Sequence, residues 1–482
     1  MNLPLPYSFC KLNKITLTQV ENTSTLHVCG DIDPATLSNI EHLFLEKIKK
    51  IKHSDDEFES LLTDLYTNKS EDFNFEEVEE IDLIDIANSI APSDDLLDDK
   101  NRGPIIKLIN ATITKAINAR ASDIHLEPFE NKLSIRFRVD GVLREVLQYQ
   151  KNITQMIISR IKIMSKLDIS ERRLPQDGRI SINIGKKEVD LRVSTLPSSF
   201  GERVVLRILE KDKKHINLDD LGFSSDILKP FRKALTRNEG IILVTGPTGS
   251  GKTTSLYSGL KEISDRSQNI LTIEDPVEYA LDGIGQTQVN NKTGLTFAKG
   301  LRAILRQDPD IVMVGEIRDK ETAEIAIQAS LTGHLVLSTV HTNSAVNAIT
   351  RLRDMGIEPY LLASSIIYVI SQRLVRKLCD KCKSPDTESS KSSLMNKYNI
   401  KGQIFKASGC SECDNTGYKG RLSIGECITV DQTLSELIYK SSSENKIADY
   451  VYKDSMKIFE NGLRLVEKGE TSLSEILRIT ED

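Results

Sequence analysis

The sequence lacks features that would place it in several other classes of protein. It has no basic excess, since 64 Lys and Arg stand against 70 Asp and Glu and the formal net charge is −6. That balance disfavours a general nucleic-acid binder. No apolar run approaches the ~18 residues of a membrane span. Residues Met1–Phe9 also lack the basic start and apolar core of an export signal. We expect a cytoplasmic protein without a nucleic-acid partner, attached to a membrane only peripherally.

Cysteine is scarce, and its spacing is informative. Four of the seven cysteines form two Cys-x-x-Cys pairs, Cys379 with Cys382 and Cys410 with Cys413. In a chain without an export signal, this pattern indicates metal binding before disulfides. Four thiolates suit tetrahedral Zn²⁺ and leave no position open for substrate, so the predicted metal is structural. Two unrelated reduced pairs, or disulfides, are the alternative.

At 482 residues the chain is long enough for several domains. One segment, from Glu71 to Asp99, contains no Lys or Arg and is rich in acids, which is typical of a solvated linker. The predicted order is a small N-terminal docking domain (1–70), an acidic linker (71–100), an α+β domain (101–216), a second linker (217–237) and an α/β ATPase domain (238–482) that includes a tetracysteine module (375–420).

The strongest motif is a phosphate-binding loop. Gly246–Thr253 matches G-x-x-x-x-G-K-[ST] in full, between an apolar strand candidate at 241–244 and a helix start at 254. The backbone N–H groups of such a loop turn onto phosphate oxygens, with the helix N-terminus behind them. Lys252 would reach the β- and γ-phosphates and Thr253 would ligate Mg²⁺. The predicted nucleotide-binding residues of this loop are Gly246, Pro247, Thr248, Gly249, Ser250, Gly251, Lys252, Thr253 and Thr254.

Three further apolar strands each lead into polar residues. Residues 269–273 lead to Glu274, Asp275 and Glu278, residues 311–314 lead to Glu316, and residues 334–340 run from His334 to His341. Ligands of parallel α/β sheets bind beyond the carboxyl ends of the strands, so we expect one shared site.

These side chains suit phosphoryl transfer from ATP. Glu316 ends a Walker B element, preceded by Asp310, and could hold Mg²⁺ through water. Glu274, Asp275 and Glu278 would orient or activate the attacking water. His334 and His341 would hydrogen-bond the γ-phosphate, although each alone could be a structural histidine.

Phosphoryl transfer also calls for an extra cation near the transferred group. The candidates in the α+β domain, which would act across subunits of a ring, are Arg179, Arg192, Arg203 and Arg207. The candidates in the ATPase domain are Arg302, Arg306 and Arg318. Surface or intradomain ion pairing is the alternative for each.

Together these residues resemble the secretion ATPase superfamily, and within it the assembly ATPases of type II secretion (general secretion pathway protein E). The resemblance spans nearly the whole chain. Outside the nucleotide motifs it rests on 5–9, 121–128, 136–141, 175–179 and 193–197. Within the ATPase domain it rests on 246–253, 274–278, 301–310, 315–319 and 333–343, together with the tetracysteine insert. The stretch 420–426 departs from the usual pattern of the family.

The resemblance implies an α/β fold class. It comprises a RecA-like P-loop ATPase domain with an inserted zinc-binding module, preceded by a PAS-like α+β domain and a docking domain. It also implies a homo-hexamer with ATP between subunits, in which the Glu274–Glu278 box and Glu316 serve hydrolysis and Arg179 and Arg192 approach the nucleotide.

The partners it implies are the cytoplasmic domain of the inner-membrane L component and the inner-membrane platform F component. Hydrolysis would drive pseudopilus assembly and the export of folded proteins across the outer membrane. A type IV pilus extension ATPase shares every nucleotide motif and is the nearest alternative. A retraction ATPase, a nucleic-acid motor and an inactive scaffold are less favoured.

Overall fold

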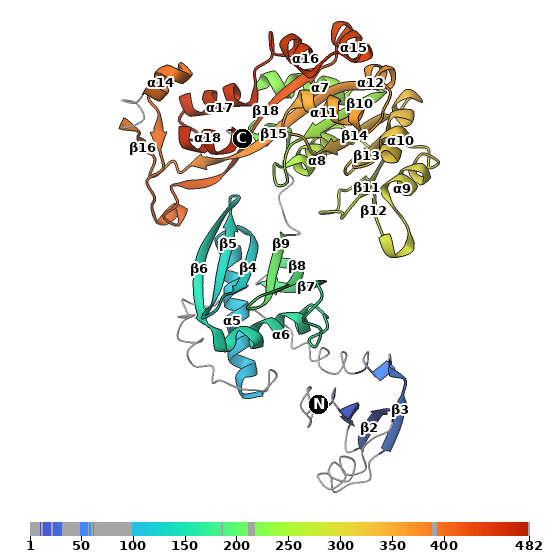
Figure 1. Ribbon diagram of the computed structural model, residues 1–482, viewed down its shortest axis with the longest axis vertical. Helices are drawn as coiled ribbons and strands as arrows, with labels where there is room; N and C mark the ends of the chain where they lie inside the picture. Colours follow the sequence, from blue (N-terminus) through green and yellow to red (C-terminus); the bar gives the residue numbers. More distant parts are fainter. Residues whose placement is uncertain are drawn as a thin grey trace. The chain divides into compact units, whose positions relative to one another are not determined.

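The computed structural model (Figure 1) describes most of the chain from residue 99 onward and short stretches before it. The described residues are 10, 13–20, 23–30, 49–55, 57, 58, 61, 99–184, 187–210, 217–387 and 393–480. They divide into two compact units, Met1–Asp212 and Lys213–Asp482. The predicted acidic linker lies outside the described residues except for its last two, which begin helix α5 (Asp99–Asn118).

The described part of the N-terminal region forms a three-stranded sheet. Its strands are β1 (Ile15–Val20), β2 (Thr23–Cys29) and β3 (Lys49–His53), in that order. β1 and β2 are antiparallel, and β2 and β3 are parallel. Ile15, Leu17 and Leu26 are buried on this sheet. The remainder of the predicted docking domain lies outside the described residues.

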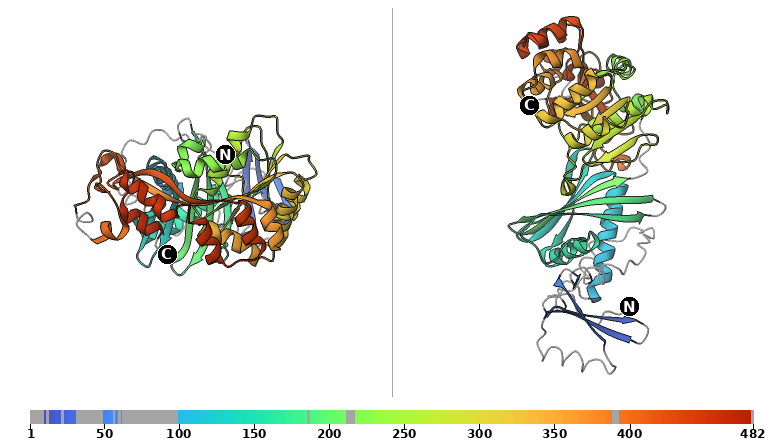
Figure 2. Two further views of the ribbon diagram at one scale, coloured as in Figure 1. Left: turned by 90° about the horizontal axis from the view of Figure 1, so that it is seen from above. Right: turned by 90° about the vertical axis from the view of Figure 1, so that its right-hand side faces the viewer.

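The rest of the first unit is a six-stranded antiparallel sheet with helices on one face. The strands are β4 (Ala121–Pro128), β5 (Lys132–Val139), β6 (Val142–Gln150), β7 (Gln176–Ile184), β8 (Lys187–Ser198) and β9 (Gly201–Glu210). Their order is β6-β5-β4-β9-β8-β7. Helix α5, η1 (Lys151–Ile153) and α6 (Thr154–Met164) supply the helical layer (Figure 2). Ile109 of α5, Ile124 of β4 and Ile157 of α6 meet in one core.

The second unit is built on a seven-stranded sheet. Its strands are β10 (Gly240–Thr245), β11 (Ile270–Glu274), β12 (Gly285–Gln288), β13 (Ile311–Val314), β14 (Leu335–Val340), β15 (Ile366–Leu378) and β18 (Tyr418–Thr429). The order is β12-β11-β13-β14-β10-β15-β18. All neighbours are parallel except β15 and β18. The carboxyl ends of the six parallel strands therefore meet at one edge.

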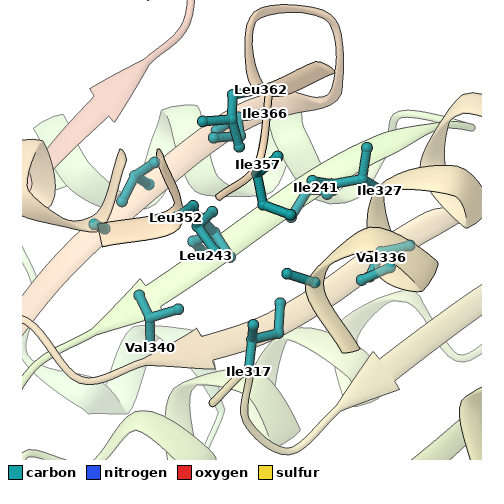
Figure 3. Close-up of a cluster of buried hydrophobic side chains, with 14 of the residues drawn as sticks. Ile241, Leu243, Ile317, Ile327, Val336, Val340, Leu352, Ile357, Leu362 and Ile366 are labelled. Carbon is teal, nitrogen blue, oxygen red and sulfur yellow. The ribbon is translucent and has the colours of Figure 1, made fainter. Parts of the chain in front are cut away.

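Helices cover both faces of this sheet, which is why its strands are continuously apolar rather than alternating. Ile242 and Val244 of β10 pack against η2 (Leu218–Leu221), α7 (Ser225–Leu235) and α8 (Lys252–Ile263). Ile241 and Leu243 point the other way, into the core drawn in Figure 3. The helices of that second face are α9 (Phe297–Ile304), α10 (Lys320–Leu331), α11 (Ala345–Asp354), α12 (Pro359–Ser365), α15 (Gln432–Tyr439) and α16 (Glu444–Val451).

Residues 217–237, predicted to be a linker, are instead part of the ATPase unit. They form η2 and α7, and Leu218, Leu228 and Phe231 are buried against the sheet. The apolar spacing of α7 accounts for this placement, because those side chains lie on one face of the helix.

The last elements carry the cysteine module. Between β15 and β18 lie β16 (Ser384–Pro385), α14 (Ser393–Tyr398), β17 (Phe405–Lys406) and η4 (Ser411–Cys413). Helices α17 (Ile458–Glu467) and α18 (Leu473–Thr480) pack on the halves of β15 and β18 that lie next to the cysteine module. The buried contacts are made by Val375, Ile424, Val466 and Ile476. None of the helices in the described part of the chain has the length and apolar character needed to span a bilayer.

Candidate active site

The phosphate loop joins the end of β10 to the start of α8. Gly246 and Gly251 have φ angles of 148° and 87°, where side chains with a Cβ are strained. A Cβ at Gly246 would also lie 2.5 Å from the carbonyl oxygen of Gln372. The loop therefore needs glycine at these positions to turn tightly over β15.

Lys252 is a buried cation at the base of this loop. Its side chain reaches back, and Nζ donates hydrogen bonds to the carbonyl oxygens of Gly246 (2.9 Å) and Pro247 (3.1 Å). Burial lowers the pKa of the Lys252 ammonium to about 8, although the nearby Glu316 carboxylate opposes that effect. The described residues place no carboxylate within ion-pair distance of Nζ. An anionic phosphate would supply the missing countercharge.

Ser250 offers a second polar atom to a ligand. Its Oγ is buried and has no hydrogen-bond partner among the described residues. Its carbonyl oxygen accepts a hydrogen bond from Gln372 Nε2 (2.6 Å), which holds the loop in place. A buried hydroxyl without a partner costs free energy unless a ligand satisfies it. The loop therefore fits a nucleotide phosphate chain.

Glu316, His341 and Arg318 lie together beside this loop. His341 Nε2 is 3.5 Å from one carboxylate oxygen of Glu316, and Arg318 Nη2 is 2.6 Å from the other. Burial, and next the positive charge of Lys252, lower the pKa of His341, so the imidazole is neutral near pH 7. The structure thus brings Lys252, Glu316 and His341 into one electrostatic cluster at the carboxyl edge of the sheet.

The loop that carries His341 is anchored on both sides. Thr342 N donates to Thr245 Oγ1 (3.0 Å), at the residue before the phosphate loop. On β15, Arg373 Nη2 donates to the carbonyl oxygen of Asn343 (3.0 Å). Sequence reasoning missed Gln372 and Arg373, because they belong to no nucleotide motif and only the strand pairing brings them to the site.

Glu274 lies in a buried hydrogen-bond network at the end of β11. Its carboxylate accepts hydrogen bonds from Tyr257 of α8, from Thr272 (2.6 Å) and from Gln286 of β12 (3.2 Å). Burial raises the pKa of Glu274 despite these donors. Asp275 and Glu278, which follow it, are exposed. Tyr257 and Gln286 were also missed, since neither stands in a recognised motif.

The two histidines of the third motif lie at opposite ends of one strand. His334 precedes β14, and its carbonyl oxygen accepts from the amide of Gly240, the first residue of β10. Its Nδ1 lies 2.9 Å from the carbonyl oxygen of Ala329 in α10. Because β10 and β14 are parallel, this is the amino edge of the sheet, away from Lys252. The structure therefore does not bring His334, a predicted nucleotide ligand, to the phosphate loop of this chain. Asp310 lies at the same amino edge, where its carboxylate accepts from Asn269 N (2.7 Å).

The arginine candidates of the α+β domain fall into two groups. Arg203 lies 2.5 Å from Glu127 and Arg207 lies 3.0 Å from Asp123, so both are neutralised within the sheet. Arg179 and Arg192 are exposed register partners on β7 and β8, and the described residues give neither an ion-pair partner.

The arginine candidates of the ATPase domain also differ from one another. Arg302 pairs with Glu321 (2.7 Å). Arg306 donates to the carbonyl oxygen of Arg302 (2.9 Å). Arg318 alone among them contacts a residue of the nucleotide cluster, Glu316.

The four paired cysteines meet at one point. Their Sγ atoms lie within 4.8 Å of one another, and the shorter separations are 3.7 to 3.9 Å. Tetrahedral Zn²⁺ with Zn–S bonds of ~2.3 Å requires sulfur atoms roughly 3.8 Å apart, so the set fits the metal. Cys413 Sγ also accepts hydrogen bonds from the amides of Cys410 (3.2 Å) and Gly417 (3.1 Å). These cysteines are not joined in disulfides, and the cluster is compatible with structural zinc.

The parallel sheet, the phosphate loop and the electrostatic cluster of Lys252, Glu316 and His341 define a P-loop nucleotide hydrolase. Residues 98–478 match the type II/IV secretion system protein family, and residues 4–66 match a separate family model that describes one domain of GSPII protein E. The chain belongs to the type II/IV secretion system protein family. The family and ATPase class predicted from the sequence are confirmed.

Full-length relatives share nearly half of its residues. The type II secretion system ATPase E of Vibrio cholerae is 48% identical over 99% of this chain and 97% of that protein. The type II secretion system protein E of Aeromonas hydrophila is 48% identical, with coverage of 99% and 96%. These relatives favour type II secretion over the type IV pilus alternative.

Solved structures support the fold. The pilus retraction motor PilT with bound ADP is similar over 77% of this chain and 96% of that one, with a TM-score of 0.52 and 25% identity. The Legionella pneumophila ATPase DotB is similar over 78% and 95%, with a TM-score of 0.58. At 21% identity, DotB supports only the fold.

Proposed function

We propose that this chain is the ATPase of a type II secretion system and that hydrolysis drives pseudopilus assembly and the export of folded proteins. The observation that carries the proposal is Lys252, a buried ammonium at the base of a glycine loop, whose Nζ donates to two loop carbonyl oxygens and has no ion-pair partner among the described residues. Such a cation needs an anionic ligand. The near full-length similarity to type II secretion ATPases supplies the biological context.

In this proposal the loop 246–251 and Lys252 bind the β- and γ-phosphates, with Thr254 following on the same helix. Thr253 and Glu316 would hold Mg²⁺, because hydroxyl and carboxylate oxygens are its preferred protein ligands. When bound, Mg²⁺ neutralises charge on the phosphate oxygens. His341 lies beside Glu316 and would hydrogen-bond the γ-phosphate as a neutral donor.

The carboxylates at the end of β11 act on the attacking water. Asp275 and Glu278 are exposed and would orient it. Glu274, whose pKa is raised by burial, is suited to take up its proton, since a base works best when its pKa approaches the ambient pH. The hydrogen bonds from Tyr257 and Gln286 would keep this carboxylate in one orientation.

A second subunit would complete the site. Arg179 and Arg192 are exposed and unpaired among the described residues, whereas Arg203 and Arg207 are held by acids. We therefore assign the first two to the nucleotide of a neighbouring subunit in a homo-hexamer. In such a ring each site would be incomplete until a neighbour supplies these cations.

The remaining parts serve attachment. We propose that residues 1–70 form a docking domain for the cytoplasmic part of the inner-membrane L component, and that 101–216 is PAS-like. The platform F component would contact the ring, so the enzyme would act in the cytoplasm, peripheral to the inner membrane. Structural Zn²⁺ at Cys379, Cys382, Cys410 and Cys413 would hold the module between β15 and β18 together.

Steady-state hydrolysis of ATP tests the catalytic proposal. Lys252→Ala should abolish turnover while circular dichroism stays unchanged. Lys261→Ala, in the last turn of the same helix, should retain it. Near-normal activity of Lys252→Ala would overturn the assignment.

Capture of the L component by the full chain, and loss of capture on deletion of 1–70, tests the docking proposal.

A further inference from the structure

Glu426 of β18 is a buried carboxylate that joins three separate elements. Only 3% of its surface is exposed. One oxygen accepts hydrogen bonds from the amide of Ala345 (2.9 Å) and from the hydroxyl of Tyr452 (2.7 Å). The other accepts from the amide of Ile458 (3.0 Å). Two backbone amides and one hydroxyl thus satisfy the whole group.

Both amides begin helices. Ala345 is the first residue of α11, and Ile458 is the first residue of α17. The first N–H groups of a helix have no partner within the helix, and the positive end of the helix dipole favours a negative charge there. Glu426 therefore stabilises the starts of two helices that are more than 100 residues apart in the chain.

One of those helices directly follows the loop of His341. The strand pairing places Glu426 opposite Ser371 of β15, and the Ser371 hydroxyl donates to the carbonyl oxygen of Asn343 (3.4 Å). The same carbonyl oxygen accepts from Arg373. The loop 341–344 is thus anchored at Thr245 before it and at Glu426 behind it.

The other helix leads to the cysteine module. Helices α17 and α18 pack on the halves of β15 and β18 that carry this module. Asn461 of α17 also donates to the carbonyl oxygen of Gly425 (2.9 Å), next to Glu426. The carboxylate is therefore the polar link between the C-terminal helices and the loop that carries His341.

We propose that Glu426 is a positioning residue for ATP hydrolysis. By fixing the first turn of α11, it keeps the His341 side chain next to the Glu316 carboxylate. It does not touch the nucleotide and acts through the loop 341–344. The proposal rests on the proposed ATPase function.

The test compares Glu426→Gln with a matched variant, Glu475→Gln. Glu475 of α18 is equally buried, and it accepts from Arg376 Nη2 (2.8 Å) and Arg478 Nη2 (2.6 Å) without touching α11. An amide at 426 keeps the shape but cannot accept from every donor. We would measure kcat, the Kd for ADP, the Kd for a non-hydrolysable ATP analogue and the unfolding temperature.

For Glu426→Gln we expect kcat to fall about 10- to 100-fold, as misplacement of a catalytic group does. The Kd for ADP should stay within about threefold, while the preference for the ATP analogue over ADP is lost. Glu475→Gln should lower the unfolding temperature and leave kcat and that preference unchanged. If Glu426 had only a structural role, the two variants would have the same kcat and the same preference for the ATP analogue over ADP.

Unchanged kcat in folded Glu426→Gln, or equal losses in both variants, would overturn the proposal. If Glu426→Gln does not fold, Tyr452→Phe decides, because it removes one donor and keeps both amide contacts. A fall in kcat of about threefold at constant ADP affinity supports the proposal, and unchanged kcat overturns it. Absence of ATP turnover in the unaltered protein would overturn the ATPase function itself, which the Lys252→Ala comparison reveals separately.

Discussion

The hydroxyl of Tyr257 donates a hydrogen bond to the carboxylate of Glu274, and both side chains are almost completely buried. This contact joins the helix behind the phosphate loop to the strand that ends in the acidic box. Burial raises the pKa of both groups, and the negative charge of Glu274 raises the pKa of Tyr257 further. The orientation of Glu274 therefore depends on a residue outside every nucleotide motif.

Removal of that hydroxyl should impair hydrolysis more than folding. In Tyr257→Phe, the described donors that remain to Glu274 are Thr272 and Gln286, so we expect kcat to fall about tenfold while the free energy of unfolding falls by ~1 kcal/mol. Steady-state kinetics and thermal unfolding measure the two effects. Tyr368→Phe is the control, because Tyr368 is equally buried and donates to Ile227 O (3.0 Å) instead. Equal kcat in the two variants would contradict the role given to Tyr257.

Nucleotide affinity should depend on pH through Lys252. The pKa of this group is lowered to about 8 by burial, so the nucleotide-free protein loses the charge as the pH rises through that value. A bound phosphate favours the charged form and raises the pKa again. Affinity for ADP should therefore fall above about pH 8, by up to about tenfold per pH unit, with uptake of a proton on binding. Calorimetry in buffers of different ionisation enthalpy measures that proton, and Lys252→Ala should abolish the dependence. A flat affinity between about pH 7 and 9 would argue against it.

The two histidines should differ in their effect on catalysis. His341→Ala removes the group beside Glu316 and should lower kcat about 10- to 100-fold with little change in ADP affinity. His334→Ala removes contacts with the carbonyl oxygen of Ala329 and the hydroxyl of Thr332 at the amino edge of the sheet, so kcat should stay within about twofold. ATPase assays of both variants measure this difference in kcat. A larger loss in His334→Ala would mean that this residue serves a site that a single subunit does not contain.

Loss of zinc should affect the cysteine module and spare the nucleotide site. Cys413→Ser, or chelation, should abolish the bound zinc and lower the unfolding temperature, while the Kd for ADP stays the same. Cys427→Ser is the control, since this cysteine lies outside the four-sulfur cluster. Metal analysis and calorimetry provide the readouts. Complete loss of ADP binding on chelation would show that the metal belongs to the nucleotide site.

Site residues could be predicted from the sequence where they belong to a motif of neighbouring residues. The order strand, glycine loop and helix predicted the structure around Lys252, and the polar residues after β13 and β14 indicated Glu316 and His341. The cysteine spacing predicted that four sulfur atoms would meet. The sequence analysis predicts a linker where the amphipathic helix α7 lies, because the segment is short and stands between two domains.

The phosphate loop, the two cysteine pairs and the apolar strands of the α/β sheet could be predicted from the sequence, because each of them is a pattern of residues close together in the chain. Which of the predicted residues share a site depends on how the strands pair in the folded chain. Parallel pairing of β10 and β14 puts His341 beside Lys252 and His334 at the opposite edge. The pairing of β15 with β10 and β18 brings in Arg373 and Glu426. These residues are linked by hydrogen bonds between distant segments, and the register of strands, which local sequence does not encode, determines those contacts.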